Sequence, residues 1–144
     1  MEGSGTMNYT NAVFPPAAQA AAFFGGADDG PFVMVNLLKF KDRAEYPDGS
    51  DSDLSGREAY ARYGAGVRAC LEAVGGKARY AGAVTELMIG EVEGLWDMVA
   101  LAQYPSRAAM MAMIQSPEYQ ALEKHRIAGL AGQLNIRTKP LADG

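Results

Sequence analysis

The side chains best suited to chemistry in this sequence are an asparagine, two tyrosines, a tryptophan, a histidine and an arginine: Asn36, Tyr60, Tyr63, Trp96, His125 and Arg126. Asn36 interrupts an apolar run, and a buried amide without partners costs roughly 1–3 kcal/mol. It therefore needs a specific partner, which is either a bound ligand or the neighbouring backbone or a tyrosine hydroxyl. We take Asn36 as a candidate catalytic residue on the first interpretation.

His125 and Arg126 follow Leu122 by three and four residues, so they flank the apolar stripe of a predicted helix. A histidine next to a cation suits proton transfer on a ligand whose carboxylate the arginine holds. The alternative is a surface pair that stabilises the C-terminal end of the helix. On the functional interpretation His125 is the second catalytic candidate and Arg126 binds the ligand.

Three aromatic residues are candidates for ligand binding. The rings of Tyr60 and Tyr63 fill core, and their hydroxyls need partners. Near Asn36, such a hydroxyl would bind a carbonyl or hydroxyl group. Trp96 is expected in the core or in a pocket wall. Asp97 is expected to cap the adjacent turn or pair with an arginine, and an Asp97–His125 dyad is a further alternative.

Composition excludes several classes of function. The chain has 144 residues, 49% hydrophobic and 21% charged, which is the composition of one globular domain. Its net charge of −4 does not favour nucleic-acid binding. One cysteine and one histidine exclude cysteine-based zinc sites and multi-histidine metal sites, so we expect no metal and no cofactor. No apolar run approaches the roughly 18 residues of a membrane span. Without a recognisable secretory signal, we expect a cytoplasmic protein.

The elements that must position these residues follow the order helix, then β-α-β-β-α-β. Residues 1–28 are expected to form an N-terminal extension with a short helix, and residues 29–144 a single domain. Capping and glycine signals predict helices over residues 17–24, 55–74 and 105–127, the last restarting at Ser116-Pro117. Strands are expected over residues 31–40, 77–89, 95–104 and 134–141.

This order predicts an α+β, ferredoxin-like sandwich, in which two helices cover one face of a four-stranded antiparallel sheet. Such a sheet normally alternates apolar and polar residues, because its other face meets water. Here the first and third strands are apolar on both faces. We therefore expect a homodimer in which two sheets pack face to face and form a dimeric α/β barrel.

Several segments resemble one bacterial family, the domain-of-unknown-function family thirteen-thirty. They are the run Met-Val-Asn-Leu-Leu-Lys-Phe (34–40), Tyr60 and Tyr63, Gly75-Gly76, Trp96-Asp97, Tyr-Pro-Ser-Arg-Ala-Ala (104–109), Ser-Pro-Glu-Tyr-Gln-Ala (116–121), His125-Arg126 and Gly129-Leu130. The resemblance extends over roughly residues 29–141. It implies the dimeric α/β-barrel superfamily, whose members range from cofactor-free oxygenases and haem-degrading monooxygenases to ligand-sensing domains. The fold therefore does not select a function.

Three hypotheses for function follow. The first is a small-molecule-binding protein or cofactor-independent enzyme, with a pocket between sheet and helices for a partly apolar ligand bearing a carbonyl or carboxylate. The second is a haem-binding or haem-degrading protein, because such relatives use an asparagine, a tryptophan and a histidine, and this chain has Asn36, Trp96 and His125. The third is a non-catalytic ligand-sensing or interaction module. The sequence leaves open whether the protein is an enzyme.

Overall fold

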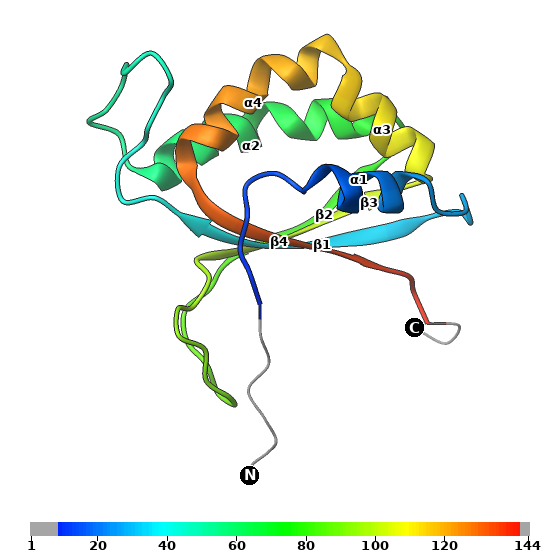
Figure 1. The fold of residues 1–144 in the computed structure, drawn as a ribbon, viewed down its shortest axis with the longest axis horizontal. Helices are drawn as coiled ribbons and strands as arrows, with labels where there is room; N and C mark the ends of the chain where they lie inside the picture. Colours follow the sequence, from blue (N-terminus) through cyan, green and yellow to red (C-terminus); the bar gives the residue numbers. More distant parts are fainter. Residues whose placement is uncertain (1–8, 142–144) are drawn as a thin grey trace.

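Helices cover one face of a four-stranded antiparallel sheet in the computed structural model, which describes residues 9–141 (Figure 1). The strand order is β2-β3-β1-β4. The elements are α1 (Ala17–Phe24), β1 (Phe32–Phe40), α2 (Gly56–Ala73), β2 (Lys77–Ala83), β3 (Met98–Tyr104), α3 (Arg107–Gln115), α4 (Pro117–Gly129) and β4 (Leu130–Thr138). The ferredoxin-like fold predicted from the sequence is confirmed. The sheet of the single chain is open and does not close into a barrel.

Serine caps set the starts of the main helices. The Ser55 hydroxyl accepts from the Glu58 amide at 3.0 Å, and the Glu58 carboxylate accepts from the Ser55 amide at 2.8 Å. This reciprocal pair satisfies two amides at the start of α2 that have no partner within the helix. Ser106 caps α3, and Ser116 caps α4 ahead of Pro117. The predicted helix starts are thus confirmed.

The strand boundaries predicted from the sequence are wrong at three places. β2 ends at Ala83 instead of residue 89, and β3 begins at Met98 instead of residue 95. The β1–β3 ladder ends where the Asp97 carboxylate accepts the Phe40 amide at 2.9 Å in place of a backbone carbonyl. Beyond β2, the Val84 amide still bonds to the Asp97 carbonyl at 2.9 Å. β4 covers residues 130–138 instead of 134–141, because α4 ends at Gly129 and Leu130 pairs at once with Phe40.

The core lies between the helices and one face of the sheet. Phe32 and Met34 of β1 pack there with residues of α2, α3 and α4, and Phe23 and Phe24 dock α1 against the same cluster. Close approach of α2 and α4 depends on glycine, since a Cβ on Gly129 would lie 2.5 Å from the Gly56 carbonyl oxygen. This contact brings the start of α2 against the end of α4.

The other face of the sheet is also apolar, and no helix of the described residues covers it (Figure 1). Directly paired residues share a face. On this open face Val35 lies between Leu101 and Ile136, while Leu37 lies between Val99 and Leu134. β4 therefore directs Leu134 and Ile136 outward and its polar residues Gln133, Asn135 and Arg137 toward the helix side, while Leu130 at its start is buried in the core.

Within residues 9–141, none of the helices is long and apolar enough to cross a membrane. The same residues contain no group of three histidine, cysteine, aspartate or glutamate side chains arranged to hold a metal ion.

Candidate functional site

A chain of polar side chains, joined by hydrogen bonds and one ion pair, runs between the sheet and the helices. We call it the polar chain, and its members are Asn36, Gln133, Arg126, Glu123, Tyr119 and Tyr63. It crosses an otherwise apolar layer, where polar groups persist only if they are paired. Three of the predicted site residues, Asn36, Tyr63 and Arg126, belong to it.

The sheet end of the polar chain is held by amides. Asn36 donates from Nδ2 to the Ala100 carbonyl oxygen at 3.2 Å and accepts at Oδ1 from Gln133 Nε2 at 2.7 Å. Of the two interpretations of Asn36, the structure therefore shows bonding to the backbone and to a neighbouring side chain. Gln133 in turn presents its Oε1 to Arg126 at 2.8 Å.

Arg126 is the charged centre of the polar chain. Its side chain is only 13% exposed, and its Nη1 lies 3.7 Å from Oε1 of Glu123, which is itself 25% exposed. Nη2 donates to Gln133 and to the carbonyl oxygen of Val13. The guanidinium thus points toward the sheet, and the interpretation of Arg126 as a surface residue is wrong.

Residues 9–14, which we call the strap, cover this guanidinium. Ala12 donates its amide to the Gln133 carbonyl at 3.2 Å, which adds one antiparallel bridge to the β4 edge. The Phe14 ring lies 5.6 Å from the Arg126 guanidinium carbon and is 55% exposed. Access to Arg126 along this edge therefore requires the strap to move.

Three tyrosines surround the helix end of the polar chain. Tyr119 donates to Glu123 at 3.0 Å, so Tyr63, whose hydroxyl oxygen lies 3.0 Å from that of Tyr119, is left as the donor between the two. Tyr60 packs against Tyr63 with ring centroids 5.2 Å apart. Burial raises the pKa of Tyr60 to about 12, and it also raises the pKa values of Tyr63 and Tyr119 well above their usual range. All three hydroxyls remain protonated donors at neutral pH.

His125 belongs to a different cluster. Its Nδ1 lies 2.7 Å from the Tyr46 hydroxyl, which also accepts from Arg62 at 3.3 Å. Arg62 pairs with Asp51 at 2.9 Å. The direction of the Tyr46–His125 bond depends on which ring nitrogen of neutral His125 carries the proton. This cluster fastens the loop between β1 and α2 to α4.

Trp96 and Asp97 lie at the opposite end of the sheet from α1. Trp96 Nε1 donates to Asn11 Oδ1 at 2.9 Å, and its ring packs against Tyr9. Asp97 pairs with Lys39 at 3.6 Å and not with an arginine. Asp97 and His125 are thus bound to separate partners, and the structure shows no dyad between them.

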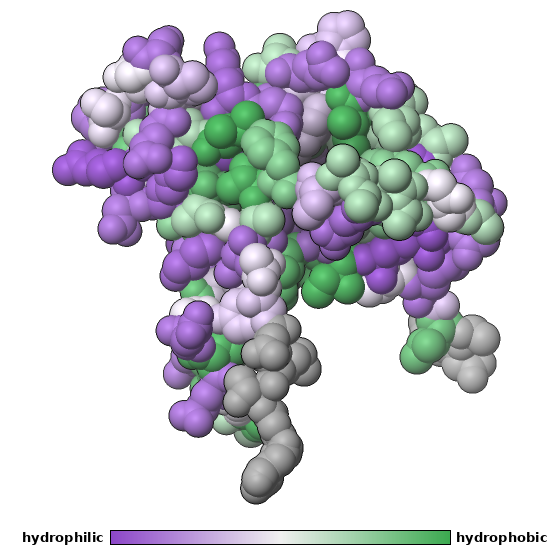
Figure 2. Space-filling view, in the orientation of Figure 1, coloured by the Kyte–Doolittle hydropathy of each residue, from purple (hydrophilic) through white to green (hydrophobic). Residues whose placement is uncertain are grey.

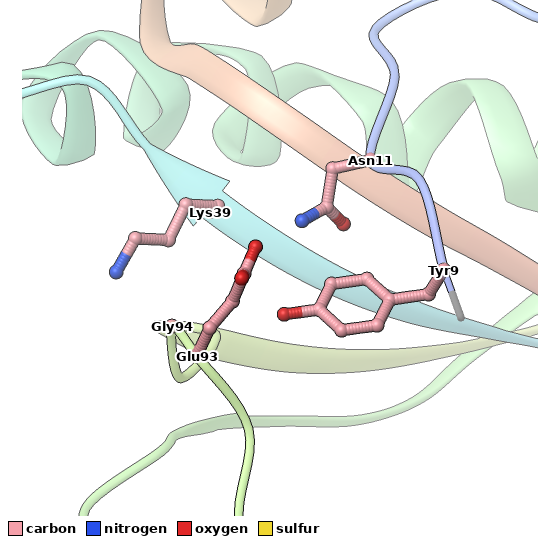
Figure 3. Close-up of a pocket in the computed structure, with 5 residues that line it drawn as sticks. All are labelled: Tyr9, Asn11, Lys39, Glu93 and Gly94. Carbon is pink, nitrogen blue, oxygen red and sulfur yellow. The ribbon is translucent and has the colours of Figure 1, made fainter. Parts of the chain in front are cut away.

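A hollow of about 460 Å³ lies at the base of the segment that joins β2 to β3, beside Tyr9 and Asn11, which contact Trp96. Tyr9, Asn11, Lys39, Glu93 and Gly94 line it, and Figure 3 shows the Glu93 carboxylate directed between Lys39 and Asn11. Lys39 follows Leu38, which faces the core, so this hollow opens on the other side of the sheet. It is therefore separate from the expected pocket between sheet and helices.

The sequence interpretation missed Gln133, Glu123, Tyr119 and Val13. Tyr119, Glu123 and Arg126 follow one another at helical spacings of four and three, which was an available signal. Gln133 was missed because the last strand was expected to begin at residue 134. Val13 acts through its carbonyl oxygen, for which its residue type gives no signal.

Comparison with family models matches residues 50–137 to a domain of unknown function, DUF1330. The chain belongs to the DUF1330 family. The match begins after β1, so the Asn36 strand lies outside it. No match was found among curated proteins.

Solved structures extend the similarity of this DUF1330 protein to nearly the whole chain. A protein of unknown function from Rhodopseudomonas palustris is 38% identical, with 92% of this chain and 98% of that chain covered and a TM-score of 0.80. A methylated form of that protein is 39% identical, with 94% of this chain and 99% of that chain covered and a TM-score of 0.82. A protein from Arabidopsis thaliana is 18% identical over 77% of this chain and 96% of its own, with a TM-score of 0.51, which shows similarity of fold alone.

Proposed function

We propose that this protein binds a small, partly apolar molecule through a carboxylate or carbonyl group at Arg126. The observation that carries the proposal is the bond from the Arg126 guanidinium to the strap carbonyl of Val13. A backbone carbonyl is a neutral acceptor from a separate segment, and a ligand oxygen can replace it without leaving an arginine donor unpaired. Charge-assisted bonds to carboxylate are roughly twice as strong as neutral ones, so the exchange favours an anionic ligand.

The surroundings of Arg126 define the rest of the ligand. Burial holds the Tyr60 hydroxyl protonated by raising its pKa to about 12, whereas the protons of Tyr63 and Tyr119 are already bonded to Tyr119 and Glu123. The Tyr60 hydroxyl and the Arg126 guanidinium are thus the donors for ligand oxygen atoms. The rings of Tyr60 and Tyr63 provide apolar and aromatic surface next to these donors. A planar or short aliphatic acid meets both requirements.

Binding without turnover fits the site better than catalysis by a tyrosine. A tyrosine with a raised pKa is a poor base at neutral pH. His125, the expected base, is bonded to Tyr46 outside the polar chain. A cofactor-independent reaction at this site would have to use Glu123 as its base, and turnover of a bound acid by the wild type but not by Glu123→Gln would establish one.

A thermal-shift panel tests the proposal. Benzoate, phenylacetate and hexanoate are compared with the matched amides and amines, using the wild type, Arg126→Gln and the exposed-site control Arg68→Gln. We expect at least one acid to raise the melting temperature of the wild type and the control but not of Arg126→Gln. The proposal fails if amines do as well as acids, or if Arg126→Gln responds like the wild type.

Haem binding has no observation in its favour. Asn36 is bonded to Gln133, Trp96 to Asn11 and His125 to Tyr46. These three residues therefore do not gather around one space that a haem could enter, and we derive no chemistry through it.

We also propose that two copies associate through the open faces of their sheets. Support comes from the two apolar rows around Val35 and Leu37, in which Leu134 and Ile136 of β4 point away from the core of their own chain. An apolar face of this kind is unfavourable in water. Sedimentation velocity should show a dimer for the wild type and a monomer for Leu101→Lys, which places a charge in the centre of that face.

A further inference from the structure

The segment between β2 and β3 projects from the sheet on the side away from the helices (Figure 1). We call residues 85–94 the arm, and all ten are exposed. Its end carries Met88 and Ile89, which are 97% and 84% exposed, and Leu87 is 46% exposed. Figure 2 shows the arm standing away from the body of the molecule. Exposure of adjacent large apolar side chains to water is unfavourable, and such patches mark interaction sites.

The arm and the open face of the sheet lie on the same side of the molecule, away from the helices (Figure 1). A second copy seated on the open face would therefore lie on the side to which the arm is directed. Burial of the exposed Met88 and Ile89 would add apolar contact to that of the sheet faces.

Charge disfavours contact between the two arms. The arm contains Glu86, Glu91 and Glu93 and no lysine or arginine. Two such segments side by side would repel each other. The β2 edge, by contrast, carries Lys77 and Arg79, both exposed. The arm therefore suits the sheet of the partner copy better than the partner's arm.

We propose that each arm clasps the second copy of this chain and buries Met88 and Ile89 against the partner's sheet. This inference rests on the proposed homodimer and adds a second contact to it. It also places Glu93 and Gly94, which line the hollow at the base of the arm, at the border of the interface.

Sedimentation equilibrium on the full chain tests the clasp with matched variants. Met88→Ser/Ile89→Ser alters only exposed side chains, so the fold is retained, and Ala65→Ser/Ala69→Ser on the exposed side of α2 is the control. Loss of two buried apolar side chains should weaken the dimer roughly tenfold or more. The control should leave the dissociation constant unchanged.

A second measurement locates the arm directly. In a mixture of copies labelled with ¹³C at methionine methyl groups and unlabelled copies, a filtered NOE experiment should connect the Met88 methyl to protons of the unlabelled partner. If the wild type and Met88→Ser/Ile89→Ser dimerise equally and this NOE is missing, the clasp is wrong and the sheet-face dimer stands. If the wild type is a monomer, or Leu101→Lys still dimerises, the sheet-face dimer itself fails and the clasp with it.

Discussion

Arg126 and Gln133 are joined by a hydrogen bond of 2.8 Å from guanidinium Nη2 to side-chain Oε1 across the junction of α4 and β4. The junction has no loop, because α4 ends at Gly129 and β4 begins at Leu130. The last turn of the helix and the first residues of the strand are therefore held at a fixed distance from each other. This places the guanidinium between the helix layer and Asn36 in the sheet.

Removal of Arg126 should destabilise the protein. Arg126→Ala leaves Glu123 without its cation and takes a donor from Gln133 Oε1, at an expected cost of about 2 kcal/mol in the free energy of unfolding. Urea unfolding measures this, and Arg68→Ala, which alters an exposed residue of α2, should change the same quantity by less than about 0.5 kcal/mol. Equal costs for the two variants would mean that the polar chain contributes nothing specific.

Gly132 should be needed to seat the strap. A Cβ at this position would lie 2.5 Å from the Cβ of Asn11. Gly132→Ala should therefore displace Asn11 from Trp96, the only tryptophan of the chain, whose fluorescence should shift to the red and become more accessible to acrylamide. Gly64→Ala is the control, since a Cβ there meets nothing within 4 Å. An unchanged spectrum in Gly132→Ala would contradict the strap geometry.

The His125 cluster should make stability depend on pH. Burial, together with the positive charges of Lys124 and Arg62, holds the pKa of His125 below its usual 6.5, against the opposing effect of Asp51. The unfolded chain then takes up the proton first as the pH falls, so stability decreases as the pH falls through about 6.5.

Melting temperatures between pH 8 and pH 5 measure this effect as a difference between the wild type and His125→Gln, which does not titrate. The wild type should lose more stability than the variant on acidification. Parallel curves would show that His125 titrates alike in the folded and unfolded states.

Alkaline pH should unmask the buried phenols. Burial raises the pKa values of Tyr60 and Tyr104 to about 12, whereas the unfolded chain ionises these groups near 10. The stability that their neutral forms provide is complete below pH 10 and is lost as the pH rises from 10 towards 12. Absorbance at the tyrosinate band should therefore show only part of the seven tyrosines ionising before the protein unfolds. Ionisation of all seven in one step near pH 10, with the fold intact, would contradict this.

Helix ends were readable from the sequence because capping is local. Ser55 with Glu58, and Ser116 with Pro117, specify their helix starts through residues only one to three positions apart. Strand ends depend on residues far apart in the sequence. The Asp97 carboxylate, for example, accepts a hydrogen bond from the Phe40 amide, and the residues around either position do not predict this contact.

The residues of the candidate site could likewise be predicted only in part from the sequence. Asn36, Tyr63 and Arg126 were recognisable as polar or amphipathic residues beside apolar stripes, and the structure brings them into one polar chain. His125 is adjacent to Arg126 in sequence, yet it points to Tyr46, because neighbours on a helix differ by about 100° in direction. Trp96 lies before β3 and packs against Tyr9, a contact set by the N-terminal strap.

The binding site is tested most directly by following the Arg126 side-chain Nε–Hε resonance of ¹⁵N-labelled protein during a titration with benzoate, phenylacetate and hexanoate. We predict a saturable shift of this resonance with at least one acid, together with release of the Ala12 amide from its bond to Gln133. Shifts confined to exposed lysines and arginines, with the Arg126 and Ala12 resonances unmoved at saturating acid, would show that no carboxylate enters between the sheet and the helices.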